Sequence, residues 1–60
     1  MLDKFVMDNI LLYHKTENYD EIVRNIILFS IKHDINYNDL FIHMTNQLFL
    51  FILFINFNNI

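Results

Sequence analysis

The chain contains neither glycine nor proline in its 60 residues, and it also has no cysteine. Without glycine, no residue takes positive φ at low cost, so turns have to be short and built from Asn, Asp and Thr. This favours helices joined by tight polar connections over a β-fold with many turns. Without cysteine, neither a disulfide nor a thiolate metal site supports the fold.

Apolar residues at helical spacing predict three helices, at about residues 2–15, 19–33 and 37–55. Asn56, Asn58 and Asn59 are expected to fray or end the third helix. Each helix carries an apolar stripe that needs a covering surface, so we expect one small all-α domain over residues 1–60. A domain of this length buries only roughly 60% of the surface of its unfolded chain. We therefore expect oligomerisation or docking on a larger partner to add stability.

Capping residues mark the starts of the second and third predicted helices. Asn18 is the expected N-cap of the second helix, with Glu21 three residues later as its capping-box partner. Asn36 is the expected N-cap of the third helix, and Ile35 and Leu40 are spaced for a hydrophobic staple. Because this second boundary favours a sharp reversal, we expect helices two and three to form an antiparallel hairpin.

The third predicted helix changes character along its length. Up to Gln47 it has one apolar and one polar face, whereas every residue from Leu48 to Ile55 is apolar. A helix that is apolar all round has to be surrounded by its own fold, by another chain or by lipid. All four basic and seven acidic residues precede Leu40, so residues 40–60 form an uncharged apolar C-terminal helix.

We predict that the apolar run at residues 48–55 is a partner interface. The same run has the composition of an aggregation-prone β-strand, because it is strongly apolar, uncharged and free of Gly and Pro; a strand is the alternative structure. In the helical interpretation, the main anchors are Leu48, Phe51, Ile52 and Ile55. The residues on the outer side are Phe49, Leu50, Leu53 and Phe54.

These features favour a non-catalytic helical protein that uses its C-terminal helix to oligomerise or to dock on a larger protein partner. The alternative is a small accessory subunit of a membrane complex, with this helix embedded in lipid. The apolar run is short of the about 20 residues that cross a bilayer. Residues 40–57 would still cross if their polar side faced another subunit.

The N-terminus does not have the pattern of a secretory signal. Asp3 and Asp8 interrupt it, and no basic segment precedes an apolar run. This favours an intracellular location, cytoplasmic or membrane-associated, over secretion.

No pattern in the sequence indicates catalysis, and we predict no enzyme activity, cofactor or small-molecule substrate. Ser30 is the only serine and lies in an apolar helix, where a bond to its own helix backbone is expected. Asp20 and Glu21 are explained as favourable charges at a helix N-terminus. A glycine-rich phosphate loop is excluded because the chain has no glycine.

Metal and nucleic-acid binding are also not predicted. Asp39 and His43 share a helix face, with His33 and Asp34 in the preceding turn, but two-ligand spacings are common by chance and a zinc site needs three or four ligands. The third helix has no Lys or Arg, and the net charge of −3 opposes binding to a polyanion.

Overall fold

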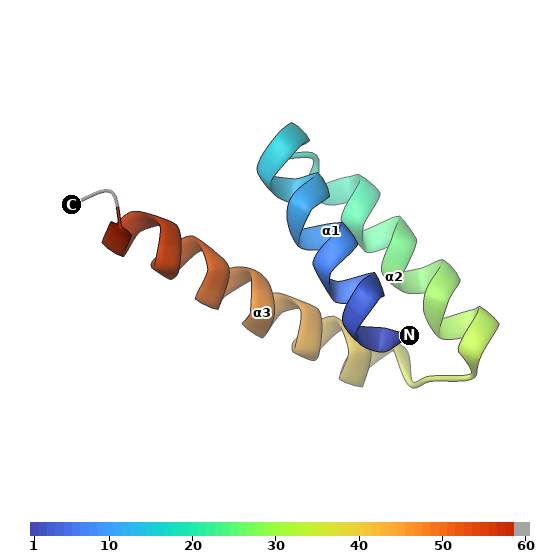
Figure 1. The fold of residues 1–60 in the computed structure, drawn as a ribbon. Helices are drawn as coiled ribbons and strands as arrows, with labels where there is room; N and C mark the ends of the chain where they lie inside the picture. Colours follow the sequence, from blue (N-terminus) through green and yellow to red (C-terminus); the bar gives the residue numbers. More distant parts are fainter. Residues whose placement is uncertain (59–60) are drawn as a thin grey trace.

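The computed structural model describes residues 1–58 and consists of three helices (Figure 1). They are α1 (Leu2–Thr16), α2 (Tyr19–His33) and α3 (Tyr37–Asn58). The all-α prediction is confirmed, and α2 and α3 pack against each other as the predicted hairpin. The apolar run at residues 48–55 is helical, so the strand alternative is wrong.

The C-terminal end of α3 differs from the prediction. The helix continues to Asn58 rather than ending near residue 55, and Asn56 lies inside it. Asn is only moderately unfavourable in a helix, so one such residue does not end a helix whose neighbours favour it. Asn59, which was also expected to end or fray the helix, lies outside the described residues together with Ile60.

Both predicted N-caps are present. The backbone N–H of Glu21 donates to Oδ1 of Asn18 at 3.3 Å, and that of Asp39 donates to Oδ1 of Asn36 at 3.1 Å. The second hydrogen bond of the predicted capping box, in which the backbone N–H of the N-cap residue is the donor, has a different acceptor. The N–H of Asn18 donates to Oγ1 of Thr16 at 3.2 Å, so Thr16 has the role that the capping-box pattern assigns to the Glu21 side chain.

The C-terminal ends of α1 and α2 have left-handed backbone conformations. Glu17 follows α1 with φ 55°, and Asp34 follows α2 with φ 53°. Glycine usually occupies such positions because a Cβ there costs roughly 1–2 kcal/mol. The two acidic residues allow the chain to close both turns without glycine, and both retain some conformational strain.

The core is small, and all three helices contribute to it. The most deeply buried side chains are Ile22, Ile26 and Met44. Every core residue lies on one of the stripes that helical spacing predicts. The buried apolar residues are Val6 and Ile10 of α1, Ile22 and Ile26 of α2, and Leu40, Met44 and Leu48 of α3.

Within residues 1–58, two polar side chains are also buried, and both are hydrogen-bonded. Asn9 donates from Nδ2 to the carbonyl oxygen of Phe5 at 2.8 Å and accepts from Nδ2 of Asn25 at 2.9 Å. Ser30 donates to the carbonyl oxygen of Ile27 at 2.7 Å, which is the predicted bond to its own helix. The hydrogen bond between Asn25 and Asn9 links α1 to α2 where the two helices are in contact.

The three helices do not lie parallel along their whole length. In Figure 1, α1 and α2 lie side by side, while α3 packs along them with its N-terminal half and diverges from α1 toward its C-terminal end. At about 1.5 Å per residue, α3 is roughly 33 Å long, and the longest dimension of the molecule is 41 Å. The C-terminal turns of α3 therefore project beyond the helix pair.

Candidate interaction surface

The eight residues of the predicted interface have three different environments. Leu48 is only 6% exposed and belongs to the core. Phe51 and Ile55 are half-buried. The other five are exposed on α3: Phe49, Leu50, Ile52, Leu53 and Phe54. Leu48 therefore anchors α3 to its own fold, and the available surface is formed by the exposed residues.

The exposed apolar residues of α3 lie opposite its core residues. Successive residues of an α-helix are rotated by about 100°, which places Leu40, Met44 and Leu48 on one side and Ile42, Phe49 and Leu53 on the other. Because α1 and α2 cover the first side, they cannot cover the second. We call the second side the outer face; it consists of Ile42, Asn46, Phe49, Leu50, Leu53, Asn56 and Phe57.

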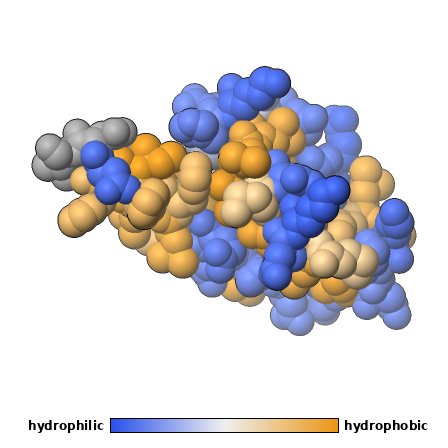
Figure 2. Space-filling view, in the orientation of Figure 1, coloured by the Kyte–Doolittle hydropathy of each residue, from blue (hydrophilic) through white to orange (hydrophobic). Residues whose placement is uncertain are grey.

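The apolar residues of the outer face are well exposed. Phe49 is 60% exposed, Leu53 48% and Phe57 79%. Figure 2 shows apolar surface gathered along the projecting end of the molecule, where α3 leaves the helix pair. Large exposed apolar patches mark contact sites for protein, membrane or ligand, or segments prone to aggregation.

Four members of the outer face lie outside the predicted interface at residues 48–55: Asn46, Asn56 and two apolar residues, Ile42 and Phe57. Ile42 lies in the half of α3 that was interpreted as polar on its outer side, and Phe57 lies between two asparagines. Their signal is the helical spacing with Phe49 and Leu53, since residues 42, 49, 53 and 57 recur on one side of the helix.

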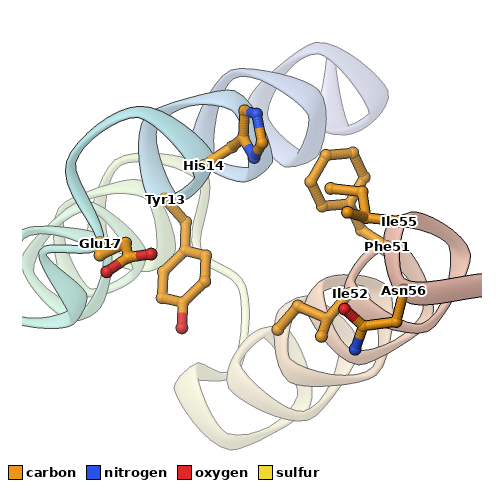
Figure 3. A pocket seen from close by; sticks show the side chains of 7 residues that line it. All are labelled: Tyr13, His14, Glu17, Phe51, Ile52, Ile55 and Asn56. Carbon is orange, nitrogen blue, oxygen red and sulfur yellow. The ribbon is translucent and has the colours of Figure 1, made fainter. Parts of the chain in front are cut away.

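A cleft separates the end of α1 from the C-terminal part of α3 (Figure 3). His14 of α1 approaches Phe51 of α3 edge-on, with ring centroids 5.7 Å apart. The cleft has a volume of about 200 Å³, below the roughly 300–1,000 Å³ of most small-molecule sites. Its lining residues are Tyr13, His14 and Glu17 on one side and Phe51, Ile52, Ile55 and Asn56 on the other.

The residues considered as metal ligands do not converge. Asp39 and His43 are both exposed on α3, whereas His33 packs against Phe29 with ring centroids 4.2 Å apart. Over residues 1–58, no three His, Cys, Asp or Glu side chains form a group that would hold a metal ion.

Helix α3 also passes a length and composition test for a membrane span. Its 22 residues include a window with a mean hydropathy of 1.7, of which 17% is buried inside the structure. The buried core helix of a soluble protein passes the same test, but most of such a helix is covered by its own fold. The low burial of α3 is shared by helices that bind lipid and helices that bind protein.

No protein-family model matches the chain, and no curated protein or solved structure matches it. The geometry and chemistry of α3 therefore carry the functional inference.

Proposed function

We propose that the protein is a non-catalytic interaction or assembly protein and that the outer face of α3 is its contact surface. The observation that supports this most directly is the exposure of large apolar side chains directly opposite the core. Phe49 and Phe57 of the outer face are 60% and 79% exposed. Burying one such side chain completely contributes roughly 1.5–3 kcal/mol, so a partner covering several of them would gain substantial stability.

A protein partner fits the length of the apolar segment better than a bilayer does. The all-round apolar run at residues 48–55 is roughly 12 Å long at 1.5 Å per residue, whereas the hydrocarbon core is about 30 Å thick. Extending the run toward the N-terminus adds His43, Asn46 and Gln47, which are costly in hydrocarbon. Polar rims beside an apolar centre are typical of protein interfaces.

The second candidate is a small accessory subunit of a membrane complex. It is supported by the hydropathy of α3, 1.7 over its best window, and by the low burial of that window. In this arrangement the polar side chains of the N-terminal half of α3 would face other subunits, and the C-terminal turns would contact lipid.

A charge placed on the outer side of α3 tests the proposed contact surface. Leu50 and Phe54 are 58% and 65% exposed, so Leu50→Glu/Phe54→Glu leaves the core intact while introducing two charges. We expect this variant to keep its helical circular dichroism and to lose association in size-exclusion chromatography with light scattering. The matched control is Leu28→Glu/Ile31→Glu on α2, where the two side chains are 58% and 74% exposed.

The control is expected to associate like the unmodified chain. Equal association of the α3 variant and the unmodified chain would refute the contact surface. Carbonate extraction of cell membranes separates the two candidate functions, because a docked protein is released and a helix embedded in lipid stays in the membrane pellet.

A further inference from the structure

The outer face of α3 carries a pattern that is symmetric about the level of residue 51 along the helix axis, although Phe51 itself points toward α1. Asn46 and Asn56 each lie five residues from residue 51, and Phe49 and Leu53 each lie two residues from it. The four are spaced by three, four and three residues, which is the seam spacing of a coiled coil. At about 100° per residue they fall within roughly 80° of the helix circumference, and all four are exposed.

We infer that the partner of this face is a second copy of the chain, packed antiparallel along α3. The two-fold axis would cross the outer face at the level of residue 51, on the side of α3 opposite the Phe51 ring, which packs against His14. The inference rests on the proposed function and names its partner. In this register Asn46 faces the partner's Asn56, and Phe49 faces the partner's Leu53. The two-fold axis repeats both pairs at the other end, so the contact is self-complementary.

The asparagines select this register. An Asn side chain has both a donor and an acceptor, so two facing amides satisfy each other inside an otherwise apolar seam. Sliding one helix by one turn would place Asn46 against Leu53 of the other copy, and sliding it by two turns would place Asn46 against Phe49. Either slide leaves a polar group unpaired at a cost of about 1–3 kcal/mol. A single buried Asn fixes register and orientation in coiled coils by the same mechanism.

The surface is suited to self-association in charge and in area. Between Leu40 and Asn58 no Asp, Glu, Lys or Arg is present, so two copies meet without like-charge repulsion. At about 150–250 Å² for a whole aromatic side chain, the exposed parts of Phe49 and Phe57 amount to roughly 200–350 Å². Ile42, Leu50, Leu53 and the two asparagines raise this toward the about 800 Å² that each partner contributes to a standard interface.

The position of the core permits this dimer. Leu40, Met44 and Leu48 face α1 and α2 from the side of α3 opposite the seam, so the other helices of both copies would lie outside a central α3 pair. A larger, unrelated protein partner would require no symmetric pattern on α3. The symmetry of the seam is therefore the observation that favours a second copy.

Cysteine cross-linking tests the register, because the chain has no cysteine of its own. Asn46→Cys and Asn56→Cys change two exposed residues and are prepared as separate full-length proteins. When they are mixed under a glutathione redox buffer, we expect a disulfide-linked dimer on non-reducing electrophoresis. Each variant alone should yield at least about 10-fold less disulfide-linked dimer. In the mixed dimer the second Asn–Asn pair is unchanged, so the interface is retained. The matched control mixes Asn38→Cys with Asn56→Cys, since residue 38 lies roughly 12 Å further along α3.

Two outcomes would overturn the inference. Cross-linking of Asn46→Cys with itself would indicate parallel helices, and a monomeric mass for the unmodified chain at about 100 µM would exclude the dimer. If the chain is monomeric but Leu50→Glu/Phe54→Glu still abolishes its retention on another protein or a membrane, the contact surface stands and only the second copy is wrong. If that variant also has no effect, both proposals fail.

Discussion

Asn25 donates a hydrogen bond of 2.9 Å from Nδ2 to Oδ1 of Asn9, and this bond crosses the contact between α1 and α2. Asn9 is only 4% exposed and donates in turn to the carbonyl oxygen of Phe5 at 2.8 Å. A slide of α1 along α2 would leave buried amide groups unpaired, which costs more than the hydrogen bond itself contributes. The Asn9–Asn25 pair therefore specifies how the two helices align.

Replacement of Asn9 by alanine is expected to lower the free energy of unfolding by about 1–3 kcal/mol, because the Asn25 amide loses its acceptor in a half-buried position. The double variant Asn9→Ala/Asn25→Ala should lose less than the sum of the two single variants. Urea denaturation followed by circular dichroism measures all three. Asn38→Ala changes an exposed asparagine and should stay within about 0.5 kcal/mol. Strictly additive losses would contradict the link between α1 and α2.

Replacement of Glu17 by glycine is expected to stabilise the fold, since Glu17 has φ 55°. Relief of the left-handed strain is worth about 1 kcal/mol, which raises the melting temperature by roughly 4–8 °C in a domain of this size. Asp34→Gly should gain less, because Asp tolerates this conformation better than Glu. Arg24→Gly, inside α2, should instead lose about 1 kcal/mol. If thermal melts show that Glu17→Gly and Arg24→Gly change the melting temperature in the same direction, relief of backbone strain at Glu17 is ruled out as the cause.

Replacement of Asn36 by alanine is expected to destabilise the start of α3. The side chain accepts from the N–H of Asp39 at 3.1 Å, and loss of such a cap costs about 0.5–2 kcal/mol. Asn36→Ser keeps an acceptor of suitable length and should be close to neutral. The comparison is made by urea denaturation, and an equal loss in the two variants would show that the cap is not the cause.

Removal of a single methylene from a core side chain is expected to lower the free energy of unfolding more than the same change on the surface does. Ile22 is fully buried, whereas Ile31 on the same helix is 74% exposed. Ile22→Val should cost about 0.5–1.5 kcal/mol, and Ile31→Val should stay within about 0.5 kcal/mol. Equal losses in urea denaturation would mean that Ile31 is covered in solution, as it would be in an assembly that buries α2.

Most of the fold follows from local chemistry and is therefore predictable from the sequence. The caps at Asn18 and Asn36 form because a short polar acceptor precedes an apolar segment, and neither depends on distant parts of the chain. The Asn9–Asn25 bond is different. The partner of Asn9, Asn25, lies 16 residues away, and the relative rotation of two helices is set by packing rather than by spacing.

The candidate surface is predictable as a segment but not residue by residue. In the run at residues 48–55 every position is apolar, so no periodicity distinguishes the side that faces the core. Packing against α1 and α2 makes that choice, burying Leu48 and leaving Phe49 and Leu50 exposed. Phe57 was missed because the flanking asparagines suggested a helix end, whereas α3 extends to Asn58.

The projection of α3 beyond the helix pair has a consequence for amide hydrogen exchange. Where tertiary contacts are few, backbone amides exchange through local opening rather than global unfolding, so protection should fall from the turn around Met44 toward Phe57. A bound partner would raise the protection of the amides near Phe57 to that of the amides near Met44, without forming any new secondary structure. The exchange profile along α3 is thus an intrinsic measure of occupancy, and a dimer centred on Phe51 would protect the amides on either side of that residue about equally.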